Sequence, residues 1–333
     1  MRDHGGDLDR AIAQYGGMPR DWLDLSTGIN PDAYPVPDLN ARAWTALPTK
    51  ADLRALEHAA ARAYGAQGPL VALAGAQAAI QLVPRLQPNT PRPTPRPCAR
   101  VLGPTYNEHG AALRAAGWAV DVVVGLEDLA GADLAVVVNP NNPDGQAHDP
   151  QALERLAPTV GRLVVDESFG DVTPGLSMVP GLHIGPSNIM VLRSFGKFYG
   201  LAGVRLGFAL GQRAEIDHLR EMAGPWAVSG PAVAIGQAAL RDTDWHIRTR
   251  AALVTGAARL DALACAAGWT LVGGTSLFRT YRTPDAATAQ ARLATHHIWS
   301  RIFPYDPHWI RLGLPPQTRW PQVDAAFEAK LKD

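Results

Sequence analysis

The chain has 333 residues, of which 47% are hydrophobic and 19% are charged, and its formal net charge is zero. These values describe a soluble globular protein with enough core for two packed regions. A balanced charge without a basic stripe excludes the electrostatic footprint of nucleic-acid binding, so a small-molecule partner is expected.

Short apolar runs alternate with alanine-rich stretches along most of the chain. In chain order, the runs of strand length are Leu70–Ala74, Ala99–Leu102, Ala119–Val124, Leu134–Val138, Leu163–Val165, Ile189–Leu192 and Leu206–Leu210. The stretches that we expect to form connecting helices are Ala76–Leu86, Glu108–Ala116, Pro150–Leu156 and Gln212–Met222. This alternation predicts an α/β fold.

Other segments depart from this alternation. The proline-rich Pro88–Pro97 segment is expected to be a surface loop, because alternating prolines cannot continue a helix or supply ladder hydrogen bonds. Beyond about residue 240, two long helical stretches and the strands Trp269–Val272 and Ser276–Tyr281 indicate a smaller unit. We therefore expect an N-terminal arm packing on that unit (residues 1–40), a large domain (41–235) and a small domain (236–333).

The cysteines and the first residues bear on metals and location. Cys98 and Cys265 lie far apart without metal-ligand spacing, so they are typical of reduced thiols and no metal site is expected. The first residues lack an apolar signal region, and no stretch approaches the roughly 20 apolar residues of a membrane span. We expect a cytoplasmic protein that does not enter a membrane.

Lys197 is the first candidate for chemistry. The 31 basic residues include only four lysines, and this one lies among glycine and apolar residues in the segment Arg193–Ala209, just past a predicted strand. An amine that attacks an aldehyde must lose its proton, which a lysine can do and a guanidinium cannot. Lys197 is therefore a candidate Schiff-base lysine, and a surface lysine in a loop is the alternative.

Polar residues follow three further predicted strands. Asp166 ends one strand and Asn142 lies in the turn after another, and ligands collect at the carboxyl ends of parallel strands. Asp166 can pair with a protonated pyridine nitrogen of a cofactor. The alternatives are that it caps a helix or binds a metal ion. Asn142 can belong to a tight turn alone. Ala76 and Gln77 open a helix after a strand, an arrangement that binds phosphate through backbone N–H groups.

The order of these elements resembles the fold-type-I pyridoxal-phosphate enzymes of the aspartate aminotransferase superfamily, over nearly the whole chain. The resemblance implies a large domain with a mostly parallel central sheet and flanking helices, a smaller α+β domain, and pyridoxal 5'-phosphate as the cofactor. It also implies that Lys197 forms the Schiff base, that Asp166 pairs with the pyridine nitrogen and that Asn142 holds the ring oxygen. The remaining implied cofactor contacts are the phosphate ligands Ser194 and Arg205 with the Ala76 and Gln77 amides, and Tyr106 stacked on the ring.

The same resemblance implies a shared site and a substrate carboxylate. Tyr64 matches a tyrosine that such enzymes lend to the cofactor phosphate of the neighbouring subunit, which implies a homodimer, although Tyr-Gly is also a common helix end. Arg311 matches the arginine that grips the substrate α-carboxylate, and a guanidinium suits this role because it donates two parallel hydrogen bonds. A structural ion pair is the alternative for Arg311.

Several features resemble one branch, the threonine-phosphate decarboxylases of cobalamin biosynthesis, which are relatives of histidinol-phosphate aminotransferases. His4 and Asn30 lie in segments similar to the opening of that family and are candidates for binding the substrate phosphate or closing the pocket; a terminal histidine without a role is the alternative. Phe169 stands where aminotransferases usually carry a tyrosine, and Pro225–Pro231 resembles a segment of the same branch. Gly196 departs from the hydroxyl residue often found before the lysine.

The implied reaction is decarboxylation of L-threonine O-3-phosphate to (R)-1-amino-2-propanol O-2-phosphate. Arg279 and Arg282 are further candidates for the substrate phosphate, unless they are simply solvated. A histidinol-phosphate-type aminotransferase is the main alternative, and an inactive pyridoxal-fold binding module is a remote one. A nicotinamide dehydrogenase is disfavoured because no GxGxxG motif follows the first strand.

Overall fold

The computed structural model describes residues 5–86, 96–185 and 188–328. His4 and residues 88–95 of the proline-rich segment lie outside these ranges. The chain divides into two compact units: unit 1 comprises residues 1–33, 143–146 and 246–333, and unit 2 comprises residues 34–142 and 147–245.

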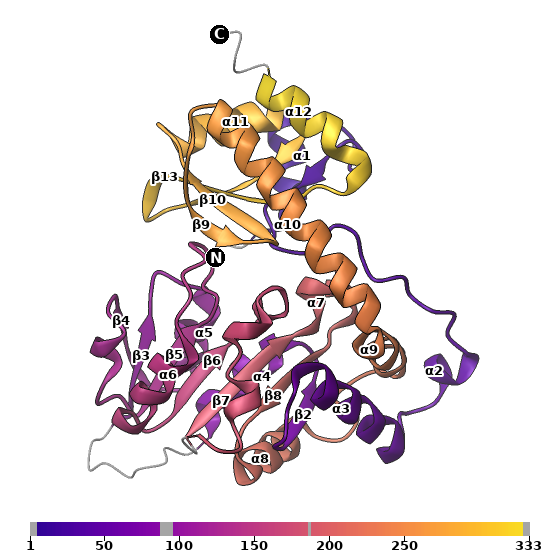
Figure 1. The fold of residues 1–333 in the computed structure, drawn as a ribbon, viewed down its shortest axis with the longest axis vertical. Helices are drawn as coiled ribbons and strands as arrows, with labels where there is room; N and C mark the ends of the chain where they lie inside the picture. The colour runs from indigo at the N-terminus through magenta and orange to yellow at the C-terminus, as the bar shows by residue number, and fades with distance from the viewer. Residues whose placement is uncertain (1–4, 87–95, 186–187, 329–333) are drawn as a thin grey trace. The chain divides into compact units, whose positions relative to one another are not determined.

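Unit 2 is built on a seven-stranded sheet with the strand order β2-β8-β7-β6-β5-β3-β4 (Figure 1). The strands are β2 (Leu70–Leu73), β3 (Cys98–Leu102), β4 (Ala119–Val123), β5 (Leu134–Val138), β6 (Leu163–Asp166), β7 (Ile189–Ser194) and β8 (Gly207–Leu210). Neighbouring strands are parallel from β7 to β4, whereas β8 runs antiparallel to both β2 and β7. This mixed sheet agrees with the α/β alternation predicted from the sequence.

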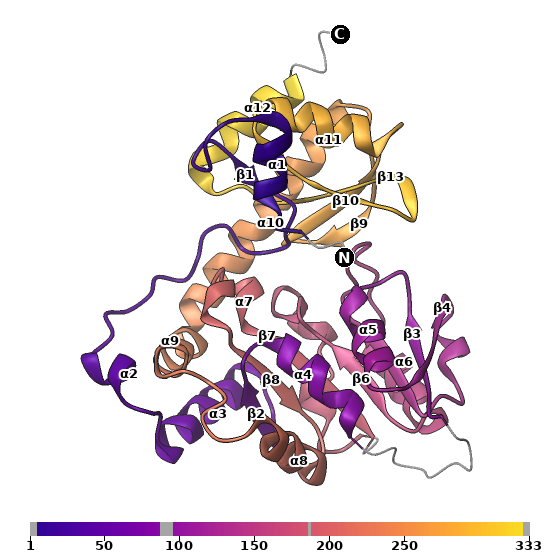
Figure 2. The same ribbon diagram turned by 180° about the vertical axis from the view of Figure 1, so that it is seen from behind.

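Helices surround this sheet. They are α2 (Ala41–Thr45), α3 (Lys50–Tyr64), α4 (Ala76–Leu82), α5 (Asn107–Ala115), α6 (Pro150–Leu156), α7 (Phe195–Phe198), α8 (Arg213–Ala223) and α9 (Gly230–Arg241). Apolar side chains of α4, α5 and α8, such as Ile80, Leu113 and Leu219, pack with strand residues in one buried cluster. These three helices therefore cover one face of the sheet, which Figure 2 shows.

The predicted helix over residues 76–86 is shorter in the structure. Helix α4 ends at Leu82, and a 3₁₀ turn follows over Val83–Arg85. Pro84 explains the change, because a proline nitrogen has no hydrogen to donate to the carbonyl four residues earlier.

Unit 1 contains two small sheets. The larger is antiparallel with the order β12-β13-β10-β9, and β1 pairs with β11 in a parallel two-stranded sheet. The strands are β1 (Leu23–Asp24), β9 (Thr270–Thr275), β10 (Phe278–Arg282), β11 (Ile298–Trp299), β12 (Arg301–Phe303) and β13 (Asp306–Gly313). Its helices are α1 (Leu8–Tyr15), most of α10 (Thr243–Ala266), α11 (Ala286–Thr295) and α12 (Trp320–Glu328).

The N-terminal segment is tied to this unit by burial as well as by pairing. Ala11 and Trp22 share a buried cluster with Ala294 and Trp299. In the part of the chain that the structure describes, no helix is both long and apolar enough to span a membrane. Within the same ranges, no group of three or more histidine, cysteine or acidic side chains is arranged to hold a metal ion.

Candidate functional site

A cavity of about 130 Å³ lies in unit 2 where several strands end. Its wall comes from the β2–α4 turn, the end of β6, the β7–α7 junction and the 3₁₀ turn before β8. The residues that line it are Gly75, Ala76, Gln77, Ile80, Tyr106, Val138, Asn142, Asp166, Ser168, Phe169, Ser194, Gly196, Lys197, Ala202, Arg205 and Leu206. Every residue that the sequence analysis assigned to the cofactor, except Tyr64, is in this set.

Lys197 is carried by α7, a single helical turn directly after β7. Phe195 and Phe198 are buried on either side of it, whereas Lys197 itself is half-buried. Its Nζ lies 5.7 Å from the centroid of the Phe169 ring. The amine therefore faces an aromatic wall inside the cavity.

Gly196, which departs from the usual hydroxyl residue, has a steric explanation. A Cβ at this position would lie 2.7 Å from Cα of Ala202, closer than real Cβ atoms come to backbone. The turn that returns toward β8 therefore approaches α7 so closely that only glycine fits. Hydroxyl groups at the cavity wall come instead from Ser194 and Ser168.

Asp166 is buried at the end of β6 and accepts hydrogen bonds on both carboxylate oxygens. The Oδ2 atom lies 2.7 Å from Nε2 of His109, and Oδ1 accepts from the N–H and the hydroxyl of Ser168 at 2.9 and 2.5 Å. Burial by itself raises the pKa of Asp166, but the contacts with His109 and Ser168 outweigh it and hold the pKa below its ordinary value. The cavity therefore contains a buried carboxylate that stays charged.

His109 was missed as a functional candidate. It lies on α5, 57 residues before Asp166 in the sequence, and is itself buried. Its ring also makes an edge-on contact with Tyr106, with ring centroids 6.3 Å apart. No local motif marks this histidine, since only the packing of α5 on the sheet brings it to the carboxylate.

The β2–α4 turn and Arg205 form one concave end of the cavity. Gly75 has φ +83° and ψ 161°, a region that is essentially restricted to glycine, and a Cβ here would lie 2.8 Å from Nη2 of Arg205. Arg205 has a left-handed backbone conformation, with φ 56°. First-turn amides of a helix have no partner inside the helix, so Ala76 and Gln77 contribute N–H groups at this end.

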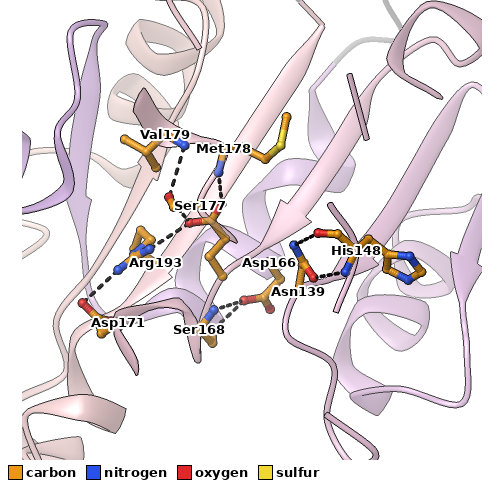
Figure 3. A network of polar contacts seen from close by, with 10 residues as sticks. Asn139, His148, Asp166, Ser168, Asp171, Ser177, Met178, Val179 and Arg193 are labelled. Carbon is orange, nitrogen blue, oxygen red and sulfur yellow. Dashed lines mark hydrogen bonds and ion pairs between the residues drawn. The ribbon is translucent and has the colours of Figure 1, made fainter. Parts of the chain in front are cut away.

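Tyr106 and Asn142 line the same cavity from other directions. The Tyr106 hydroxyl donates to Oε1 of Gln77 at 3.3 Å. Near Asn142, the side chain of Asn139 bonds twice to the backbone of His148, at 3.1 and 2.8 Å (Figure 3). The side chain of Asn141 contacts Thr105 and Pro104. These contacts fix the turn that presents Asn142.

Tyr64 lies elsewhere. It is buried, its ring packs 5.8 Å from that of Phe208, and the Arg193 guanidinium lies 4.3 Å from its centroid. The residue expected to reach a second subunit therefore faces the interior of its own chain, which argues against that role.

The substrate candidates Asn30 and Arg311 belong to unit 1. Asn30 is buried, and its Oδ1 accepts from the Asp32 N–H at 3.1 Å. Arg311, on β13, is also buried, donates to the Ser26 carbonyl at 2.5 Å and lies 5.3 Å from the Phe278 ring centroid.

Arg301 was also missed by sequence reasoning. It lies on β12 directly opposite Arg311 in the antiparallel register, so the two arginines share one face of the sheet. The candidates Arg279 and Arg282 are paired with acids instead: Arg279 binds Asp261 through two bonds of 2.9 and 2.8 Å, and Arg282 lies 3.4 Å from Asp306. Only the strand register shows that Arg301 and Arg311 are neighbours on the sheet.

Comparisons with known proteins identify the family of the chain. Residues 20–329 match the sequence profile of the family described as aminotransferase class I and II. A threonine-phosphate decarboxylase from Sinorhizobium is 43% identical, covering 99% of this chain and 96% of that protein. One from Pseudomonas aeruginosa is 42% identical, covering 98% and 97%. A histidinol-phosphate aminotransferase from Ruegeria is 38% identical but covers only 35% of this chain and 33% of its own.

Among solved structures, a histidinol-phosphate aminotransferase from Sinorhizobium meliloti, in complex with pyridoxal-5'-phosphate, superposes with a TM-score of 0.81. The match covers 97% of this chain and 94% of that one at 18% sequence identity. At that identity the likeness establishes the fold alone.

Proposed function

The chain belongs to the aminotransferase class I and II family, as the sequence resemblance predicted, and we propose that it decarboxylates L-threonine O-3-phosphate with pyridoxal 5'-phosphate as cofactor. The observation that carries the proposal is the pair of threonine-phosphate decarboxylases matched over nearly the whole chain at 42–43% identity. The histidinol-phosphate aminotransferase from Ruegeria matches about a third of the chain, and other such aminotransferases match up to about half of it. The product is (R)-1-amino-2-propanol O-2-phosphate, and the place in cobalamin biosynthesis is part of the proposal.

The donor set in the cavity fits this cofactor. The concave end offers the Arg205 guanidinium, the Ser194 hydroxyl and the first-turn amides of α4, which suit a phosphate group. Lys197 supplies the amine for the aldehyde, and the charged Asp166 suits a protonated pyridine nitrogen. Asn142 and Tyr106 are proposed to hold the ring oxygen and the ring face.

Pyridoxal phosphate supplies the electron sink that makes loss of a carboxyl group from an amino acid feasible. The carbon–carbon bond to the substrate carboxyl group breaks, carbon dioxide leaves, and a proton is added to Cα. Lys197 Nζ is the proton donor that we assign to this last step, because it is the one amine among the described residues that line the cavity. Phe169 has no hydroxyl, so it cannot donate the hydrogen bond that a tyrosine would supply at this position.

The substrate carries a carboxylate and a phosphate, and unit 1 carries two adjoining arginines. We propose that Arg311 binds the substrate carboxylate and that Arg301, which lies opposite it on the same face of the sheet, serves the phosphate. For Asn30 and His4, binding of the substrate phosphate or closure of the pocket stays a prediction.

We further propose a homodimer that associates through unit 2. Two large apolar side chains are exposed at helix α2. Trp44 lies in the helix and is 69% exposed, and Leu47 lies two residues after its end and is 60% exposed. Trp226, near the start of α9, is exposed at 54%. Gly230 of α9 packs so closely on the Ala43 carbonyl that a Cβ would overlap it, so these exposed residues belong to neighbouring elements. The cytoplasmic location stays a prediction.

Product analysis tests the function. The purified, pyridoxal-phosphate-loaded protein is incubated with L-threonine O-3-phosphate and no keto acid, and products are identified by mass spectrometry. Catalytic formation of aminopropanol phosphate is expected from the native chain, and none from a Lys197→Arg variant, which keeps the charge but lacks the amine. A single turnover that leaves pyridoxamine phosphate identifies an aminotransferase and overturns the proposal.

A further inference from the structure

The ends of β6 and β7 carry charged residues behind the cavity wall as well as in it. Asp166 and Ser194 line the cavity, and each has a charged neighbour, Glu167 and Arg193, that does not line it. Successive residues of a strand point to opposite faces, so Arg193 projects away from the cavity. Both Glu167 and Arg193 are buried, at 0% and 3% exposure. The mechanism described above uses neither of them.

Arg193 binds two acids at once (Figure 3). Its Nη1 lies 2.8 Å from Oε2 of Glu167. Its Nη2 lies 2.8 Å from Oδ1 of Asp171, the contact that the figure labels. Burial by itself lowers the pKa of the guanidinium, but Asp171 and Glu167 outweigh that effect and raise it. The Tyr64 ring covers one face of the guanidinium at 4.3 Å. Arg193 is thus a permanently charged centre enclosed by protein groups.

Glu167 extends these contacts along the segment that follows β6. Its carboxylate accepts the Ser177 hydroxyl and the Met178 N–H, both at 2.6 Å. Ser177 Oγ in turn accepts the Val179 N–H at 3.2 Å. Arg193 therefore holds two acids of the segment 167–179, and one of them, Glu167, also holds Ser177 and Met178.

The same segment carries two residues of the cavity wall. Ser168 bonds to Asp166, and Phe169 faces Lys197. Gly170, the next residue, is packed so tightly that a Cβ would lie 2.8 Å from Nη1 of Arg193. Any outward movement of this segment must therefore displace Ser168 and Phe169 relative to Ser194 and Lys197 on the β7 side.

We propose that Arg193 is a positioning residue that fixes the Ser168–Phe169 wall against the lysine-bearing end of β7. The proposal rests on the proposed function only in that pyridoxal phosphate binds in this cavity. Removing the guanidinium leaves Glu167 and Asp171 buried without their shared cation, a situation that strongly destabilises its surroundings. The segment then relaxes, and the Asp166 and Lys197 environment changes with it.

The chain offers a matched control in a second buried ion pair. Arg162 precedes β6 and contacts Oε1 of Glu215 at 2.9 Å through Nε and at 2.6 Å through Nη2. It is 1% exposed, so its burial matches that of Arg193. It lies at the amino end of β6, and neither Arg162 nor Glu215 lines the cavity. Loss of this pair removes similar buried contacts without touching the wall.

The test compares Arg193→Met with Arg162→Met in the full-length, cofactor-loaded protein. Three quantities are measured: the melting temperature, the dissociation constant of pyridoxal phosphate, and the pH midpoint of the cofactor absorption band. We expect both variants to have a lower melting temperature than the native chain. Only Arg193→Met is expected to shift the pH midpoint of the absorption band and to raise the dissociation constant of pyridoxal phosphate, by about tenfold, which is the loss seen when residues that orient metal ligands are replaced. Arg193→Lys, which keeps the charge, is expected to restore part of the affinity.

Two results overturn the proposal. One is an unchanged cofactor affinity and midpoint in Arg193→Met, and the other is an equal change in both methionine variants, which would indicate a purely structural role. If Arg193→Met does not fold, Asp171→Asn decides by the same two readouts, because it weakens the hold on the guanidinium at Nη2, and native affinity and midpoint in it overturn the proposal. The cofactor affinity and the absorption spectrum are measured without substrate. The test therefore remains valid even if the chain does not decarboxylate L-threonine O-3-phosphate.

Discussion

At the scale of single residues, the charge on Asp166 depends on its neighbours. A buried carboxyl group ordinarily favours its protonated form, and here the contacts with His109 and Ser168 reverse that tendency. We expect His109→Phe to raise the pKa of Asp166 and to weaken pyridoxal-phosphate binding by about tenfold, since one hydrogen bond to a charged group is worth about 1.5–3 kcal/mol. Titration of the cofactor-free protein with pyridoxal phosphate measures the affinity. His109→Gln, which keeps a side-chain donor, is the control. Equal affinity in His109→Phe and the native chain contradicts the prediction.

The same carboxylate makes a pH-dependent contribution to stability. Its pKa in the folded chain lies below the ordinary value of 3.8, so Asp166 stabilises the fold above that pH, and the contribution disappears as the pH falls further. We expect the melting temperatures of native and Asp166→Asn protein, both without cofactor, to differ at pH 6, to keep that difference down to about pH 4, and to converge only as the pH falls further through the lowered pKa. A difference that is constant with pH would contradict the assigned charge.

Phe169 offers a prediction on the cofactor. Phe169→Tyr adds a hydroxyl group to the aromatic wall 5.7 Å from Lys197. If the ring oxygen lies where Asn142 is proposed to hold it, a donated hydrogen bond favours the ionised oxygen and shifts the pH midpoint of the absorption band downward by about one unit. Spectroscopic pH titration of the two proteins measures the shift. Phe169→Leu, which removes the ring without adding a donor, should not lower the midpoint.

The limit of sequence reasoning at this scale is set by tertiary contacts. Lys197, Asp166 and Asn142 could be placed in one cavity because each follows a parallel strand, and such strand ends meet. His109 and Arg301 could not, because their importance comes from a helix packed on the sheet and from a strand register. Neither arrangement leaves a local pattern in the sequence.

At the scale of elements, the turn into α4 depends on glycine. Gly75→Ala places a methyl group near Arg205 and requires a backbone conformation that costs about 1–3 kcal/mol for other residues. We expect the variant to lose affinity for pyridoxal phosphate and, competitively, for inorganic phosphate. Gly117→Ala is the control, because Gly117 also has a positive φ, 90°, but has open space around it. An equal loss of affinity in both variants would show that strain alone is responsible.

Some elements carried a signal that was not used. Helix α3 begins with a complete capping box, in which Thr49 and Asp52 bond reciprocally, and this pattern is readable from the sequence. The single turn α7 has no such signal, because four residues are too few for a periodic pattern. It forms because Phe195 and Phe198 are buried around Lys197, which is a consequence of the complete fold.

At the scale of the whole molecule, two features follow from chain topology. Strand β8 runs against its neighbours, although its apolar sequence is like that of the parallel strands. Residues 143–146 belong to unit 1, where Thr280 donates to the Pro143 carbonyl and Gly145 packs against Gly274. The direction of a strand, and the unit to which a short segment belongs, depend on the elements that pack against them. An alternation of apolar and helical stretches in the sequence therefore cannot predict either.

The exposed apolar residues of unit 2 give the prediction at this scale. A tryptophan exposed at 69% on α2 and a leucine exposed at 60% beside it are unfavourable on a monomer surface, and burial of both in a dimer removes that cost. We expect Trp44→Asp to raise the dimer dissociation constant by at least about tenfold, because aromatic anchors carry much of the binding energy of an interface. Sedimentation over a range of concentrations measures it. Val124→Asp is the control, since Val124 is exposed at 81% but follows the edge strand β4 rather than α2. A monomeric native chain, or equal weakening in both variants, would rule out α2 as the dimer contact.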